Sequence, residues 1–191
     1  SGDEDQNQET LILEFINGPT LGNIQNLHLS SKDKNKIIFE IILVLNYLHN
    51  HHFIYRDLKP NNIMIDKNKT IILIDLDRMI EIDEKEIENT NYQTIIFHSY
   101  SSPELEEGQI VSNKTDIYSL GMLMYYIVFE EEPSISKIHE KLSERDNKYI
   151  PILNLINNCV EEKANERPSI TELLKNFYIN FYSKTADKLT E

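Results

Sequence analysis

The sequence predicts a mainly α fold with a minor β ribbon, in one domain. Apolar residues recur at helical spacing over four stretches, and two short Ile-rich runs flank a polar turn. Of the 191 residues, 40% are apolar, which suffices for one domain with a sizeable core.

The N-terminal part is predicted to contain little regular structure. Residues 1–10 are polar and acidic, and we interpret them as a loop, a disordered segment or a tag. The first ordered element is predicted at Leu11–Phe15, a short strand that Asn17, Gly18 and Pro19 end. This strand has no evident partner strand in the chain.

A buried helix and a hairpin are predicted next. From Lys36 to Asn50, apolar residues follow helical spacing and also occupy further positions around the helix, which indicates deep burial. Ile63–Ile65 and Ile71–Ile74 flank the polar residues 66–69, a pattern typical of two short strands joined by a turn.

The second half of the chain is predicted to be helical. Residues 82–100 are acidic and polar and predict a long mobile segment. Three helices are predicted after it, at Asp116–Phe129 with Asn113 or Thr115 as cap, at Ile150–Val160 and at Ser169–Phe177. Residues 183–191 are interpreted as a tail.

Charge and cysteine content exclude several classes of function. The formal net charge of −13 argues against binding to nucleic acid or to an anionic membrane, because phosphates would be repelled. The single cysteine, Cys159, excludes an intrachain disulfide, and no apolar run is long enough to span a membrane. We therefore expect a soluble protein of a reducing compartment, the cytoplasm.

The most informative motif combines two polar segments. Residues 55–62 read Tyr-Arg-Asp-Leu-Lys-Pro-Asn-Asn, and residues 75–77 read Asp-Leu-Asp after an apolar strand. In order and spacing, Asp57, Asn62 and Asp75 resemble the catalytic and metal-binding loops of protein kinases. The alternative is a polar hairpin loop in which Asp and Asn have turn roles.

The resemblance extends over roughly residues 11–180 and is closest to eukaryotic-type Ser/Thr kinases of the tyrosine-kinase-like group. It implies a hinge at residues 11–18 and a C-terminal lobe at residues 19–182, with the N-terminal lobe absent from the chain. It also implies ATP and Mg²⁺ as cofactors and a protein as substrate.

The resemblance assigns roles to the polar residues of the motif. Asp57 would orient the acceptor hydroxyl, and Lys59 would approach the transferred phosphate. Lys59 also favours a Ser/Thr acceptor. Asn62 and Asp75 would supply oxygen ligands to Mg²⁺.

An adenine site is implied at the hinge. Leu13 would be the gatekeeper, with the Glu14 carbonyl and the Ile16 amide as backbone partners of adenine. Met64 would form the floor of the site, and its alternative interpretation is an ordinary core residue, because Met often fills irregular gaps.

Further residues resemble supporting positions of the family. Glu104, after Ser102 and Pro103, is the expected buried partner of Arg167. Asp116 would hold the catalytic loop through backbone hydrogen bonds, or would simply cap a helix. Arg56 is of the type that receives a phosphate, which predicts phosphorylation at Thr90, Tyr92 or Thr94.

Several features depart from the family pattern. No Gly-rich loop, strand Lys or helix Glu precedes the hinge. Asp77 stands where the family has Gly, at a position where positive φ is a concern. Leu76 and Tyr55 replace Phe and His at positions expected to pack into an apolar column. Phe97 falls near the position where the family usually has a Thr that contacts the catalytic Asp and Lys. His49, His51 and His52 are interpreted as residues of a helix end rather than metal ligands.

Two functions remain open on these grounds. The first is a fragment of an ATP- and Mg²⁺-dependent Ser/Thr kinase that is inactive when isolated. The alternative is a pseudokinase or lobe-only scaffold, with a regulatory protein bound on its helical face. An upstream Gly-rich loop and strand Lys would favour the enzyme.

Overall fold

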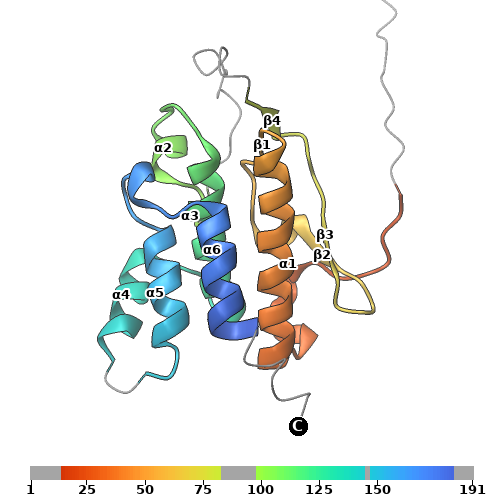
Figure 1. The fold of residues 1–191 in the computed structure, drawn as a ribbon. Helices are drawn as coiled ribbons and strands as arrows, with labels where there is room; N and C mark the ends of the chain where they lie inside the picture. Colours follow the sequence, from red (N-terminus) through yellow and green to blue (C-terminus); the bar gives the residue numbers. More distant parts are fainter. Residues whose placement is uncertain (1–13, 83–97, 145–146, 183–191) are drawn as a thin grey trace, which may run out of the picture.

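The computed structural model describes residues 14–82, 98–144 and 147–182, which are mostly helical with two small antiparallel sheets (Figure 1). The predicted fold class, mainly α with a minor β ribbon, is confirmed in these residues. The elements are, in chain order, η1 (Leu21–Leu27), α1 (Ser31–Asn50), β1 (Phe53–Ile54), η2 (Pro60–Asn62), β2 (Ile63–Ile65), β3 (Ile71–Leu73), β4 (Ile80–Glu81), α2 (Pro103–Glu106), α3 (Asn113–Phe129), α4 (Ile135–Ser143), α5 (Ile150–Cys159), η3 (Ala164–Glu166), α6 (Ile170–Phe177) and the π-helical turn η4 (Tyr178–Tyr182).

Helix α3 forms the centre of the core. Every residue from Thr115 to Ile127 is buried, because α1 packs against α3 from one side and α5 from another (Figure 1). Gly121 permits the close approach of α5, since a Cβ there would lie 2.7 Å from the Cβ of Cys159. Burial raises the pKa of the Cys159 thiol to about 12, so this cysteine is an inert core residue.

Helix α1 begins at Ser31, earlier than the apolar pattern from Lys36 predicts. Ser30 forms a capping box with Asp33, in which each side chain accepts a hydrogen bond from the other residue's backbone N–H. The first turn is polar and has no apolar periodicity, so the cap rather than the apolar pattern marks where the helix starts.

The later helices agree with the prediction except at one cap and one element. α3 is capped by Ser112, whose Oγ accepts from the Lys114 N–H at 3.2 Å, so neither Asn113 nor Thr115 is the cap. α5 and α6 occupy the predicted stretches. α4 was not predicted, although Ile135, Ile138 and Leu142 follow helical spacing and lie in or against the core; the helix has only 9 residues, most of them polar.

The strand predicted at Leu11–Phe15 is wrong for the residues that the structure describes. Glu14 and Phe15 are in no strand, and Phe15 is 86% exposed. A strand needs a hydrogen-bonded partner, and none of the described strands pairs with these residues. Residues 1–13, the predicted mobile residues 83–97 and the tail at 183–191 lie outside the described residues.

Two short ladders hold two loops opposite each other. β1 pairs with β4 (Phe53↔Glu81, Ile54↔Ile80), and β2 pairs with β3 in the predicted hairpin. Since β1 precedes β2 and β4 follows β3, the whole segment is one long hairpin that opens in its middle into residues 55–62 and 74–79. The Ile74 N–H donates to the Asn62 carbonyl at 2.9 Å and closes one end of the opening.

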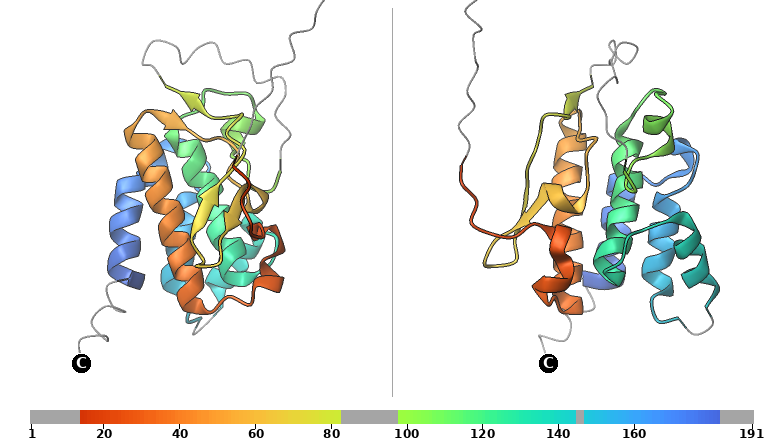
Figure 2. Two further views of the ribbon diagram at one scale, coloured as in Figure 1. Left: turned by 90° about the vertical axis from the view of Figure 1, so that its right-hand side faces the viewer. Right: turned by 180° about the vertical axis from the view of Figure 1, so that it is seen from behind.

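The long hairpin lies on the side of α1 away from α5 and α4 (Figure 2). The segment before η1 runs beside it, because the Ile65 N–H donates to the Pro19 carbonyl at 2.9 Å and Thr20 bridges to Met64. Among the described residues, no helix is long and apolar enough to cross a membrane.

Candidate active site

Asp116 anchors the loop that carries Asp57. The Asp116 carboxylate is fully buried and accepts the backbone N–H groups of Tyr55 at 2.9 Å and Arg56 at 2.8 Å. His49 Nε2 lies 2.9 Å from the same carboxylate. Asp116 is inside α3 and is not its cap, so the helix-cap alternative is wrong. Arg56 adopts a φ of 65°, which these two hydrogen bonds hold in place.

Asp57 itself is surrounded by hydrogen-bond donors. Its side chain is 1% exposed, and Lys59 Nζ lies 3.0 and 2.8 Å from its two oxygens. Asn62 Nδ2 donates to Asp57 Oδ2 at 2.9 Å and to the Asp57 carbonyl at 3.0 Å. Asp57, Lys59 and Asn62 are therefore brought together in one cluster.

Two further donors reach Asp57 from other segments. Arg78 Nη1 lies 3.3 Å and His98 Nε2 3.1 Å from Asp57 Oδ1. His98 Nδ1 accepts the Tyr100 backbone N–H at 3.2 Å, which leaves the ring proton on Nε2, where it donates to Asp57. Both side chains are partly exposed, at 24% for Arg78 and 22% for His98.

These donors decide the charge of Asp57. Burial raises the pKa of its carboxyl, but the hydrogen bonds from His98 and Lys59 and the charges of Lys59 and Arg78 outweigh burial and lower it to about 2. Asp57 is thus a firmly ionised carboxylate that orients donors rather than a strong proton acceptor.

Asn62 and Asp75 have the donor chemistry that Mg²⁺ requires. Because Asn62 gives its amide N–H groups to Asp57, its carbonyl oxygen remains as a ligand. The Asp75 carboxylate is exposed and receives no hydrogen bond from a described residue. An amide oxygen and a carboxylate fit a hard cation that keeps several of its waters. Within the described residues, no group of three or more His, Cys, Asp or Glu is arranged for a metal.

Residues 74–79 and Tyr55 depart from the family pattern, and the structure shows the consequence of each departure. The positive φ, 60°, falls on Asp75, and Asp77 does not share it, so replacing Gly by Asp at 77 adds no such strain. Tyr55 is fully buried, and its hydroxyl donates to the Ile74 carbonyl at 2.5 Å, which ties the two loops together. Leu76 is 50% exposed and belongs to neither apolar cluster, so its expected packing is wrong for the described residues.

The implied adenine residues are only partly described. Leu13 lies outside the described residues. Glu14 is exposed, Ile16 is intermediate, and neither belongs to a regular element. Met64 is intermediate in exposure and lies in β2 beside Thr20, so it is not a fully buried core residue.

Glu104 and Arg167 form a buried, bidentate ion pair. Arg167 Nη1 and Nη2 lie 2.7 and 2.9 Å from the two Glu104 oxygens, and Arg167 is 2% exposed. The remaining Arg167 N–H groups donate to the carbonyls of Lys114, Glu161 and Glu162. Burial raises the pKa of Glu104, and Arg167 more than compensates and lowers it. This pair joins α2 to the α5–α6 connection, and its role is structural.

Arg56 has a described partner that sequence alone does not suggest. Its Nε donates to the Arg78 carbonyl at 2.6 Å, which links the two facing loops. The predicted phosphorylation sites Thr90, Tyr92 and Thr94 lie outside the described residues.

His98 and Arg78 are the residues that sequence reasoning missed. Phe97 was expected near Asp57, and it lies outside the described residues, whereas its neighbour His98 contacts the carboxylate. A His or an Arg in a polar loop carries no pattern of its own. The available signal was the short distance in sequence between His98 and Ser102-Pro103-Glu104. If the family position that we compared with Phe97 is moved by one residue along this chain, it falls on His98.

The histidines near the end of α1 have separate surroundings. His49 contacts Asp116, and His51 Nδ1 lies 2.8 Å from the Tyr47 carbonyl. His52 has a φ of 63° in the turn that follows α1. Their partners are a carboxylate and backbone groups, as expected of residues at a helix end.

Comparison with known proteins identifies the family. Residues 3–179 match the protein kinase domain. The chain belongs to the protein kinase family.

Relatives of this kinase chain are named as serine/threonine kinases. It is 33% identical over 184 residues to a probable serine/threonine-protein kinase of Dictyostelium discoideum, covering 86% of this chain and 42% of the relative. It is 30% identical over 132 residues to a probable serine/threonine-protein kinase of Lactococcus lactis, covering 68% of this chain and 21% of the relative. A serine/threonine-protein kinase of Caenorhabditis elegans is 27% identical over 191 residues, 88% of this chain and 52% of the relative. The kinase chain thus spans between about a fifth and a half of these relatives.

Proposed function

We propose that the protein containing this chain is an ATP- and Mg²⁺-dependent Ser/Thr protein kinase that phosphorylates protein substrates. The observation that carries the proposal is the buried Asp57 carboxylate, held by Lys59 and Asn62 in a loop that faces Asp75 across the opened hairpin. Phosphoryl transfer depends on positioning and charge stabilisation, and this cluster supplies both.

Each polar residue has a proposed role. Asp57 orients the Ser or Thr hydroxyl of the substrate, and Lys59 places its ammonium beside the transferred phosphate. Asn62 and Asp75 would hold Mg²⁺ through their oxygens. When bound, Mg²⁺ neutralises phosphate charge.

We assign residues 11–18 to the hinge and residues 19–182 to the C-terminal lobe. Adenine would contact the Glu14 carbonyl and the Ile16 amide, with Leu13 as gatekeeper and Met64 below. This assignment is supported by the segment at Pro19 and Thr20, which hydrogen-bonds beside β2 and so brings the hinge close to Met64. The single buried Cys159 favours the cytoplasm.

The chain alone is expected to have little activity. No residue in it matches a Gly-rich phosphate loop or the strand Lys of the family. The phosphates would therefore be positioned from one side only, and positioning provides much of the rate.

The test is Mg²⁺–ATP-dependent phosphorylation by the full-length protein and its Asp57→Asn variant. We expect Asp57→Asn to lower kcat by at least about a hundredfold, because the acceptor hydroxyl loses its orienting carboxylate. Asp66→Asn is the matched control, since Asn keeps an oxygen for the Asn68 and Thr70 N–H groups in the β2–β3 turn. Equal rates for wild type and Asp57→Asn would show that Asp57 has another role.

A binding module without turnover is the second candidate, favoured by the crowding of Asp57. Lys59, Asn62, Arg78 and His98 all donate to its two oxygens, so an acceptor hydroxyl has to displace a donor. A partner would then bind the helical face. Asp57-dependent phosphate incorporation rejects this candidate, and a full-length protein that incorporates none supports it.

A further inference from the structure

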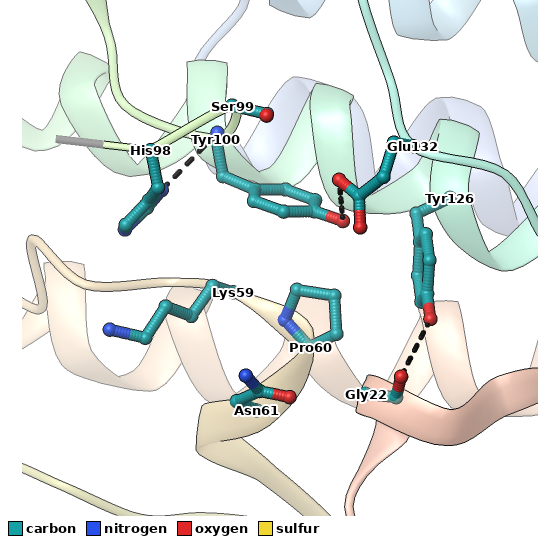
Figure 3. A pocket seen from close by; sticks show the side chains of 9 residues that line it. All are labelled: Gly22, Lys59, Pro60, Asn61, His98, Ser99, Tyr100, Tyr126 and Glu132. Carbon is teal, nitrogen blue, oxygen red and sulfur yellow. Dashed lines mark hydrogen bonds between the residues drawn. The ribbon is translucent and has the colours of Figure 1, made fainter.

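A donor from the segment before α2 contacts Asp57. His98 Nε2 lies 3.1 Å from Asp57 Oδ1, although 41 residues separate the two in sequence. Lys59 and Asn62, by contrast, belong to the same loop as Asp57. His98 therefore joins the Asp57 loop to a distant part of the chain, and both His98 and Lys59 lie in the wall of a cavity of about 280 Å³ beside Asp57 (Figure 3).

A compact turn holds the His98 ring in place. The Ser101 N–H donates to the His98 carbonyl at 2.8 Å, and the His98 N–H donates to Ser101 Oγ at 3.0 Å. His98 Nδ1 accepts the Tyr100 N–H at 3.2 Å, and Figure 3 shows the ring beside this group. Because Nδ1 is an acceptor, the ring proton is on Nε2, and the turn directs that N–H toward Asp57.

Arg78, the other donor from outside the Asp57 loop, is held less firmly. Its Nη1 lies 3.3 Å from Asp57 Oδ1, and within the described residues its guanidinium has no other hydrogen-bond partner. His98 has a shorter bond to the same oxygen and a second ring nitrogen tied to the backbone. Of these two donors, His98 is therefore the one that can fix the direction of the carboxylate.

The family pattern gives this contact to a different residue. A Thr is expected near Phe97, and a Phe side chain has neither a hydrogen-bond donor nor an acceptor. The next residue, His98, supplies a donor from its ring instead. Burial raises the pKa of Asp57, and the His98 hydrogen bond is the largest of the influences that lower it, which agrees with a close contact.

We propose that His98 is a positioning residue for phosphate transfer, because its Nε2–H holds the Asp57 carboxylate in the direction from which it orients the acceptor hydroxyl. The proposal rests on the proposed kinase function, since Asp57 is the group that is positioned. His98 keeps its ring proton throughout and exchanges none with the substrate. A misplacement of a reacting group by about 1 Å can lower a rate about a hundredfold, so a donor outside the loop can matter for turnover.

Two substitutions separate the two hydrogen bonds of the ring. Gln places an amide N–H close to the position of Nε2 in His, and Asn places an amide oxygen close to the position of Nδ1. His98→Gln therefore keeps the donor to Asp57 and loses the acceptor for the Tyr100 N–H, whereas His98→Asn does the reverse. A residue that only holds the turn would be replaced by Asn, and a residue that positions Asp57 would be replaced by Gln.

The first test is phosphorylation of one Ser peptide by the full-length protein and its variants. We expect His98→Asn to lower kcat about ten- to a hundredfold with KM changed less than about twofold, and His98→Gln to stay within about threefold of wild type. His139→Asn, exposed on α4, is the matched control and should keep the wild-type kcat. If His98→Asn has the wild-type kcat, or retains more activity than His98→Gln, the inference is overturned and the kinase proposal stands.

The second test does not depend on turnover. Long-range ¹H–¹⁵N NMR spectra show which ring nitrogen carries the proton, and the His98 signals are assigned by their loss in His98→Gln. We expect the proton on Nε2, with a resonance that shifts in Asp57→Asn; a proton on Nδ1, or an unshifted Nε2 resonance, overturns the inference. If wild type transfers no phosphate, the kinase proposal fails and the role of His98 in transfer fails with it, whereas the spectra decide separately whether His98 holds Asp57.

Discussion

Glu104 and Asp57 are both nearly buried carboxylates with lowered pKa, yet the structure satisfies them in different ways. Among the described residues, the one charged partner of Glu104 is Arg167, whose other N–H groups donate to backbone carbonyls. Asp57 has donors from several segments, and those from Arg78 and His98 come from partly exposed side chains.

The difference separates a fold-holding ion pair from a site that can exchange its partners. Arg167 cannot leave Glu104 without burying two unpaired charges, which fixes α2 against the α5–α6 connection. A donor can leave Asp57 toward solvent while the others keep the carboxylate ionised. The comparison predicts large stability effects at the first site and smaller electrostatic effects at the second.

The largest effect is expected at the Glu104–Arg167 pair. Arg167→Met should lower the free energy of unfolding by about 3–5 kcal/mol, because it leaves Glu104 as a buried charge without a partner. Urea denaturation followed by circular dichroism measures the loss. Lys163→Met is the control, since its ion pair with Glu166 is exposed and should contribute less than about 1 kcal/mol. Equal losses in the two variants would contradict this account.

A smaller effect is expected from acid. The pKa of Asp57 in the folded chain, about 2, lies below its ordinary value of 3.8, so the folded state binds fewer protons. The stabilisation from ionised Asp57 is present above pH 3.8 and is lost as the pH falls toward 2, on the order of 2 kcal/mol. The free energy of unfolding of Asp57→Asn should therefore fall less than that of wild type across this window. Urea titrations at each pH measure both slopes, and parallel slopes would refute the lowered pKa.

The smallest effect is expected when one donor is removed from Asp57. Among the influences that lower the pKa of Asp57, the His98 hydrogen bond is the strongest and the Arg78 charge is weaker. His98→Ala should therefore raise this pKa more than Arg78→Ala does. Carboxyl ¹³C chemical shifts recorded during a pH titration would measure the change, and a larger rise in Arg78→Ala would reverse the assignment of donors.

Much of the helical part could be predicted from the sequence because its signals are local. The apolar period located α1, α3, α5 and α6, and the Ile-rich runs located β2 and β3. The ladder of β1 and β4 was missed because each strand has two residues, too few for a periodic pattern. The start of α1 was missed because it depends on the Ser30–Asp33 cap.

The site was predicted in part for a similar reason. Asp57, Lys59 and Asn62 are close in sequence and are brought together by one loop. His98 could not be predicted, because its contact with Asp57 spans 41 residues and depends on how residues 98–101 turn. The exposure of Leu76 could not be predicted either, because it depends on which residues distant in sequence pack against its side chain.

The sequence by itself determined the location of α1, α3, α5 and α6, the β2–β3 hairpin and the order of the polar residues in the motif, because periodicity and spacing are properties of neighbouring positions. Only the tertiary structure decided which donors surround Asp57 and which glutamates of residues 130–132 have an ion-pair partner among the described residues. Lys34 and Lys141 reach Glu130 and Glu131 from α1 and α4, and Glu132 faces the cavity beside Asp57. Charge balance at a site is a sum over groups close in space, and folding sets those distances.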